Sequence, residues 1–257
     1  MKKYILLFFT FLIISESYSQ NKNAGVVIYS QKYNLIGFAD SNFYKLSFNN
    51  ESSVYEEVKT DYISEKRLND EEAKSEVLIN PSKKNELFYY SNFKINKLFY
   101  NMVAFDNYLM VEDDIAKIGW ELIDEFKIIG NFECQKARCK FRGRNYVAFF
   151  TNEIPVIYGP WKFNGLSGLI LEVYEENYKI HIVAKEVNIS KTDIVDFTKF
   201  KKMDFSQAIP YENLNEKVKE LNVEFLTRLN SKLPQGVKPF KLDANCSDCG
   251  EDLEITK

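Results

Sequence analysis

The chain has 257 residues and a formal net charge of −3, and a mildly acidic chain is a poor general binder of nucleic acid. We therefore expect no nucleic-acid partner. Aromatic residues make up 15% of the chain, with 21 Phe and 16 Tyr, and these residues favour strands. The composition predicts a mainly β fold, and the length is sufficient for one sizeable β domain or two small ones.

The N-terminus carries an export signal. Lys2 and Lys3 precede an apolar run, Tyr4 to Ile14, and small residues follow at Ser17 and Ser19. This order predicts a signal peptide of 19 residues. The run is shorter than the roughly 20 apolar residues that span a bilayer, and no second long apolar run follows. We expect no transmembrane helix in the mature chain, and an exported protein that is periplasmic, outer-membrane-associated or secreted.

Strand patterns recur along the mature chain, and we predict one antiparallel β domain over residues 20–243. The β-rich or alternating runs cover residues 24–33, 43–48, 54–58, 86–90, 98–111, 118–128, 132–141, 146–151, 169–174 and 178–187. Charged and amide residues dominate 59–85, which is typical of a solvated excursion. Alternating apolar residues from Ile118 to Ile128 predict a half-buried strand. Gly130-Asn131 then predicts a two-residue hairpin turn.

The period changes near the C-terminus. Apolar residues spaced three and four apart occupy positions Leu214, Val218, Leu221, Phe225 and Leu229. They predict an amphipathic helix at about 211–232, with its stripe buried against the sheet. A polar tail, 244–257, follows. The predicted fold is mainly β (α+β): an antiparallel curved sheet or open half-barrel with one long C-terminal amphipathic helix.

Segment 159–170 concentrates Gly, Pro and Trp. Gly and Pro impose particular backbone angles, so the segment predicts a structural corner more than a reactive centre. The candidate turn residues are Gly159, Pro160, Gly165, Ser167 and Gly168. We expect Trp161 and Phe163, like Trp120, to anchor the core, because large aromatics dominate buried area. The alternative is an exposed aromatic platform for sugar or lipid.

Several local patterns combine around this segment. They lie at residues 132–137, 141–146, 153–155, 159–163 and 165–170. Over residues 119–174 the chain resembles the GLPGLI family, exported proteins of Bacteroidota-type bacteria named for their Gly-Leu-Pro-Gly-Leu-Ile motif. The resemblance implies export and a shared fold. Because the family has no established biochemical activity, it transfers no catalytic residues.

The chain departs from the family motif at Ser167, which stands where the motif has Pro. Leu-Pro-Gly-Leu suits a type II turn, with positive φ at the Gly, here Gly168. If that turn forms, Ser167→Pro should stabilise the protein by about 0.4–1 kcal/mol, because Pro restricts the unfolded chain.

Four cysteines, Cys134, Cys139, Cys246 and Cys249, are disulfide candidates because the chain is predicted to be exported. On one extended strand Cys134 and Cys139 would face opposite ways and lie roughly 17 Å apart, beyond disulfide reach. Two arrangements remain open: one or both of them pair with the tail, which we favour, or Cys246 and Cys249 close a small ring. A zinc site ranks below these options and redox catalysis ranks last. We predict no metal and no cofactor.

Five cations share one parity: Lys136, Arg138, Lys140, Arg142 and Arg144. On one continuous strand they would form a basic row that could hold an anionic ligand, such as a lipid head group or an acidic glycan. A solvated face balanced by acidic neighbours is the commoner use of such a row. Gly143 would break the row if it ended the strand.

Catalytic patterns are weak, and we predict no catalytic residue. The one histidine, His181, alternates with Ile180 and Ile182 and is expected on the solvent side. The predicted function is a non-enzymatic envelope module that binds an envelope protein or a small ligand, either anionic or apolar, an apolar one lying in the sheet's concavity. The alternatives are an interaction module without a ligand pocket and a carboxylate-dependent hydrolase.

Overall fold

The computed structural model describes residues 24–35, 38–58, 87–190, 195–234 and 236–240. The predicted signal peptide, the charged excursion and the tail with Cys246 and Cys249 lie outside these residues.

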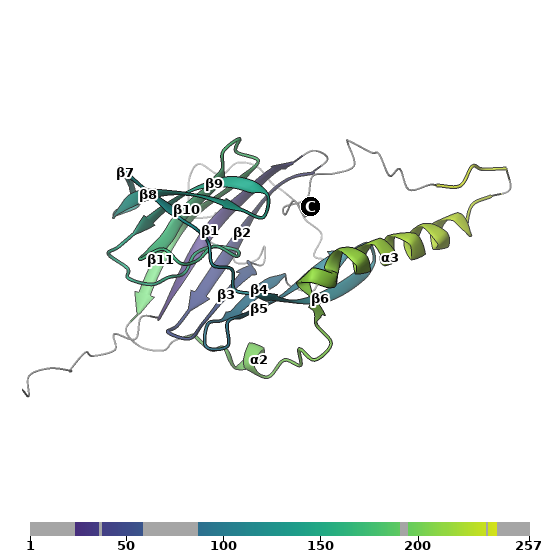
Figure 1. Cartoon of the computed structure of the whole chain (residues 1–257), viewed down its shortest axis with the longest axis horizontal. Coiled ribbons are helices and arrows are strands. Elements are labelled where there is room, and N and C mark those ends of the chain that lie inside the picture. The colour runs from purple at the N-terminus through teal and green to yellow at the C-terminus, as the bar shows by residue number, and fades with distance from the viewer. Residues whose placement is uncertain (1–23, 36–37, 59–86, 191–194, 235, 241–257) are drawn as a thin grey trace, which may run out of the picture.

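Twelve strands form one open sheet. The strands are β1 (Ala24–Leu35), β2 (Phe38–Phe48), β3 (Ser52–Glu57), β4 (Phe88–Asn92), β5 (Lys97–Ala104), β6 (Asn107–Asp114), β7 (Glu121–Ile129), β8 (Phe132–Phe141), β9 (Arg144–Thr151), β10 (Leu169–Glu175), β11 (Ile180–Ser190) and β12 (Ile209–Pro210). The helices are α2 (Thr198–Lys201) and α3 (Tyr211–Asn230). This mainly β architecture, with one long helix near the C-terminus, confirms the predicted fold (Figure 1).

The strand order is β12-β6-β5-β4-β3-β2-β1-β11-β10-β9-β8-β7. All neighbours are antiparallel except the short pair β12–β6. The N-terminal strand therefore lies mid-sheet, where it joins a meander of β1 to β6 to a second meander of β7 to β11. This arrangement leaves β7 as one end strand of the sheet.

Tight hairpins set the register of both meanders. Gly130 has φ +60 and Ile129 lies opposite Phe132, which confirms the predicted two-residue turn between β7 and β8. The single strand expected over 98–111 is wrong, because the chain turns at Phe105-Asp106 and forms β5 and β6. Phe105 adopts φ +56 there without the Gly that usually marks such a turn.

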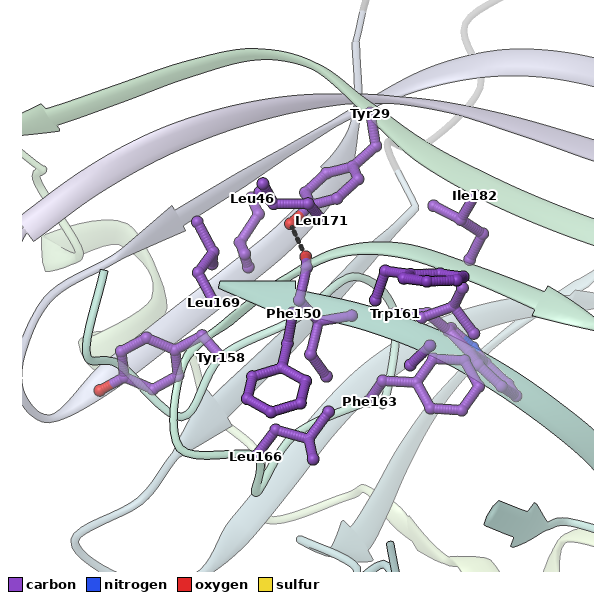
Figure 2. Packing of buried hydrophobic residues seen from close by; sticks show 14 of the residues in the cluster. Tyr29, Leu46, Phe150, Tyr158, Trp161, Phe163, Leu166, Leu169, Leu171 and Ile182 are labelled. Carbon is purple, nitrogen blue, oxygen red and sulfur yellow. Dashed lines mark hydrogen bonds between the residues drawn. The ribbon is translucent and has the colours of Figure 1, made fainter. Parts of the chain in front are cut away.

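The core has three parts. The largest lies between strands β1–β3 and strands β8–β11 and includes side chains of the loop that follows β9 (Figure 2). A second joins β5 and β6 to α3, and a third joins strands β3–β5 to the α2 region. Among the described helices none has the length and apolar character needed to cross a membrane.

Helix α3 buries only part of its predicted stripe. Leu214 and Leu221 are buried against β5 and β6, whereas Leu229 is exposed. Phe225 stacks on Phe105 at the β5–β6 turn, with ring centroids 5.2 Å apart. The helix extends away from the sheet in Figure 1, so its far end has less of the sheet to cover it.

Candidate ligand-binding face

The loop between β9 and β10, residues 152–168, packs into the main core. Its buried apolar side chains are Ile154, Val156, Tyr158, Trp161, Phe163 and Leu166. Trp161 and Phe163 are 6% and 2% exposed, and Figure 2 shows both among the packed side chains of this cluster. The loop thus packs its own apolar side chains into the core beside the sheet.

Trp120 lies just outside this core. Its ring is half-buried, 6.1 Å from the Phe163 ring, and its Nε1 donates to the Asn164 carbonyl oxygen at 2.9 Å. The third aromatic predicted as an anchor therefore ties the segment before β7 to the loop.

The loop turns sharply at Pro160. The Phe163 N–H donates to the Pro160 carbonyl at 3.0 Å, and Trp161 holds φ +55 between them. This is the first central position of a turn that normally takes Gly. Nearby Gly159 has no room for a Cβ, which would lie 2.8 Å from Ile170 Cδ1. Gly165 supplies another left-handed position, with φ +93.

The predicted type II turn at Ser167-Gly168 is wrong, because Gly168 is not left-handed. Gly168 is needed for a different reason. A Cβ there would lie 2.0 Å from the Thr151 carbonyl oxygen, so only Gly allows this approach to the end of β9. The Ser167 hydroxyl donates to Asn152 Oδ1 at 2.8 Å. Because the type II turn is absent, Ser167→Pro is no longer expected to stabilise the protein.

The basic row is shorter than predicted. β8 ends at Phe141, so Arg142 lies in the turn with φ +46, and Arg144 is buried on β9. Lys136, Arg138 and Lys140 remain on β8, where Lys136 Nζ lies 2.5 Å from Glu125. Arg138 and Lys140 are the exposed members of the row.

Arg142 instead joins a buried charged cluster. Arg142 lies 2.6 Å from Asp113 Oδ2 and 3.9 Å above the Tyr211 ring. Lys162 Nζ lies 3.4 Å from the same carboxylate and 4.1 Å above the Tyr100 ring. The adjoining cavity measures about 10 Å³, room for a single water. The cluster links the loop, β6 and the start of α3, which favours a structural role.

The feature that sequence reasoning missed lies on β10, on β11 and in the turn between them. Tyr174 and Tyr178 stack with ring centroids 4.5 Å apart and planes 6° apart. The His181 ring stands almost perpendicular to both, 6.0 Å from Tyr174 and 5.7 Å from Tyr178. We call these three residues the tyrosine platform. Tyr178 is 57% exposed, so the platform presents an aromatic surface to solvent.

The hairpin turn holds Tyr178 in a strained backbone conformation. The hairpin turn closes with a bond from the Tyr178 N–H to the Glu175 carbonyl at 2.7 Å, and Tyr178 then adopts φ +56. That left-handed position in a three-residue hairpin loop normally takes Gly. The buried Glu175 carboxylate fixes the turn by accepting the Asn177 N–H at 2.8 Å. A bulky residue held in this conformation suggests a use for its ring.

Strand register places cations on both sides of the platform. Arg138 lies opposite Val147, Val147 opposite Tyr174, Tyr174 opposite His181, and His181 opposite Lys32. Directly opposed residues project from the same face of a sheet. Strands lie about 4.8 Å apart, so exposed Arg138 and Lys32 flank Tyr174 at roughly 10 Å on either side.

A buried carboxylate supports the platform from β10. His181 Nε2 donates to Glu172 Oε1 at 2.8 Å, and Lys127 pairs with the other oxygen. Burial by itself would raise the pKa of Glu172, but the hydrogen bonds and charges of His181 and Lys127 hold it below its ordinary value. His181 is therefore half-buried and oriented by a carboxylate, rather than simply solvent-side.

Burial also raises the pKa of Tyr174 to about 12, and the neighbouring Tyr178 adds to this effect. Tyr174 therefore stays a neutral phenol at physiological pH. Glu172 and Tyr174 are two residues apart on one strand, so the sequence alone indicates that they share a face of the sheet. The position of His181 beside them depends on hairpin register, which the sequence did not reveal.

The described cysteines, Cys134 and Cys139, are both buried free thiols and do not pair with each other. Burial raises the pKa of Cys134 to about 11 and that of Cys139 to about 12, so both are poor nucleophiles. Pairing with the tail cysteines involves residues outside the described part. In that part, no group of three His, Cys, Asp or Glu side chains could hold a metal ion.

Comparisons with known proteins bear on the family and on the fold. A family described as "Protein of unknown function (Porph_ging)" matches residues 142–172. This segment runs from the β8–β9 turn to Glu172, overlaps the GLPGLI-like motif and is consistent with that resemblance. No curated protein matches the chain.

Two solved structures of PNGF-II, in space groups C2 and P21, are similar to the chain. Each has a TM-score of 0.50 and 15% sequence identity, over 77% of this chain and 33% of the PNGF-II chain. The chain thus spans about a third of the length of PNGF-II. At this identity the likeness concerns the β-rich fold alone.

Proposed function

We propose that the protein is an exported, non-enzymatic binding module of the cell envelope, of the GLPGLI type, and that its tyrosine platform binds an acidic glycan. The observation that carries this proposal is the exposed Tyr178 ring, which a strained backbone holds against Tyr174 and His181. Export rests on the N-terminal signal pattern in the sequence.

The chemistry of the face selects this ligand class. The C–H face of a sugar ring is apolar and suits stacking on an exposed aromatic ring such as Tyr178. Arg138 and Lys32 lie on the same face and suit carboxylate, sulfate or phosphate groups along a saccharide chain. Glu172 is already paired with Lys127 and His181, so its negative charge opposes an anion less.

The buried acids do not favour the hydrolase alternative. Asp113 is paired with Arg142, and Glu172 with His181. Glu175 accepts backbone N–H groups of its own turn. The buried carboxylates of the described residues are thus each engaged by a cation or by a turn, whereas acid–base hydrolysis needs two acids facing one substrate.

Isothermal titration calorimetry with tetragalacturonate, an acidic tetrasaccharide, tests the proposal, with maltotetraose as the neutral probe. We expect saturable binding of the acidic probe alone. Tyr178→Ala and Arg138→Ala should each weaken it at least about tenfold, equivalent to 1.4 kcal/mol. Tyr108→Ala and Lys219→Ala remove an exposed tyrosine and an exposed cation elsewhere and should leave it unchanged. Equal binding of both probes, or equal loss in the control variants, would refute the platform as the site.

A further inference from the structure

The end strand β7 exposes three large apolar side chains. Leu122, Phe126 and Ile128 are 57%, 54% and 66% exposed, although their alternation had predicted a half-buried strand. They lie opposite Ala137, Gln135 and Glu133 of β8, whose register shows that they share one face of the sheet. Contiguous apolar side chains of this size on a surface commonly mark an interaction site.

The position of β7 in the sheet explains the exposure. β7 pairs with β8 on one side, and no described strand pairs with its outer side. Every second residue of such an edge directs a backbone N–H and C=O outward, where another strand can pair with them. The opposite end of the sheet differs, because β12 pairs with β6 there and α3 packs beside it.

The bulge in β7 limits the pairing to a short, defined stretch. The register shifts between Ile123 and Phe126, so Asp124 and Glu125 stand outside the ladder. Bulges usually blunt an edge strand. The regular stretch from Phe126 to Ile129 nevertheless continues to the hairpin turn and carries two of the three exposed apolar side chains.

The charges around the edge are acidic. Glu121, Asp124 and Glu125 of β7 and Glu133 of β8 are all exposed. Glu125 pairs with Lys136 of β8, Glu121 lies opposite Arg138, and Lys127 of β7 is turned to Glu172. The acids of β7 nevertheless outnumber its one cation by three to one. A second copy of the chain paired edge to edge would bring two such acidic sets together, which is unfavourable. A basic partner would find complementary charges.

We propose that the outer edge of β7 binds an extended segment of another protein by strand addition, and that this segment alternates apolar with basic residues. The backbone of the edge supplies the ladder, the apolar side chains of β7 contact alternate partner side chains, and the surrounding carboxylates select Lys or Arg. This site shares no residue with the tyrosine platform, although Lys127 of β7 pairs with the Glu172 that orients His181.

Fluorescence anisotropy with labelled eight-residue peptides tests the proposal on the purified full chain. One peptide alternates Val with Lys, and the other alternates Val with Glu. We expect the Lys peptide to bind and the Glu peptide to bind at least about tenfold more weakly. Ile128→Lys should weaken binding of the Lys peptide to a similar degree, whereas Val223→Lys, at another exposed apolar position on α3, should not. Tyr178→Ala should leave peptide binding unchanged.

Methylation of backbone nitrogens in the peptide distinguishes strand addition from non-specific hydrophobic binding. N-methyl groups on one set of alternate peptide residues should abolish binding, while methyl groups on the other set should preserve it, because only one edge of the peptide joins the ladder. Equal effects of the two patterns would overturn the proposal, as would the absence of saturable binding. Two further outcomes would overturn the proposal by showing a different occupant of the edge. A dimer seen in sedimentation and dissociated by Ile128→Lys would show that a second copy of the chain occupies it. A crosslink from position 128 to another segment of the same chain would show that this segment occupies it.

Discussion

Tyr178 provides a quantitative test, because its ring and its backbone contribute to stability with opposite signs. The ring stacks on Tyr174, and such aromatic pairs contribute about 0.5–1.5 kcal/mol beyond their burial. The backbone at φ +56 costs a non-glycine residue about 1–2 kcal/mol. Tyr178→Ala loses the stacking and keeps the backbone strain, so it should destabilise the protein by about 0.5–1.5 kcal/mol.

Tyr178→Gly loses the same stacking but relieves the strain. The greater freedom of Gly in the unfolded chain offsets about 0.5–1 kcal/mol of that relief. The Gly variant should therefore have a free energy of unfolding about 0–1.5 kcal/mol higher than that of the Ala variant, measured by urea denaturation at constant m-value. An Ala variant more stable than the Gly variant would show that the strain is smaller than this range, and the argument from strain would fail.

Three further predictions concern the loop after β9 and the buried carboxylate. Gly168→Ala should lower the free energy of unfolding by about 3 kcal/mol in urea denaturation, because the added Cβ would collide with the backbone of Thr151. Gly165→Ala should lower it by about 1–2 kcal/mol, because of its left-handed φ alone. Equal losses in the two variants would contradict the close approach of Gly168 to Thr151. Ser167→Pro should not raise the melting temperature, because it removes the hydrogen bond from the Ser167 hydroxyl to Asn152. A higher melting temperature would indicate that the type II turn does form. The lowered pKa of Glu172 contributes stability that is present above the ordinary value of 4.5 and is lost as the pH falls through the lower folded value. Unfolding free energy should thus decline below pH 4.5, less steeply in Glu172→Gln, and identical acid profiles would contradict this role.

Much of the fold could be predicted because local patterns determine it. The alternation of apolar residues gave most strands, Gly130-Asn131 gave a hairpin turn, and the spacing from Leu214 to Leu229 gave the long helix. The β5–β6 turn was missed, since Phe105 takes a left-handed conformation without a glycine signal. Tertiary packing overrides local preference at such positions.

The candidate sites were harder to predict, because they depend on register and on strand order. The parity of β8 placed Arg138 and Lys140 correctly on one exposed face, but the two-residue turn after Phe141 removed Arg142 and Arg144 from it. Likewise, the apolar row of β7 gave no sign that β7 would be an end strand. Burial of a strand depends on its neighbours, which local alternation does not specify.

The most direct test of the glycan-binding account is aromatic NMR of the purified protein titrated with tetragalacturonate. Ring signals of Tyr174, Tyr178 and His181 should shift with one common saturation curve, while the rings of Tyr100 and Tyr211 in the Asp113 cluster should stay unchanged. Absence of shifts at the tyrosine platform, or shifts confined to another part of the protein, would contradict the account.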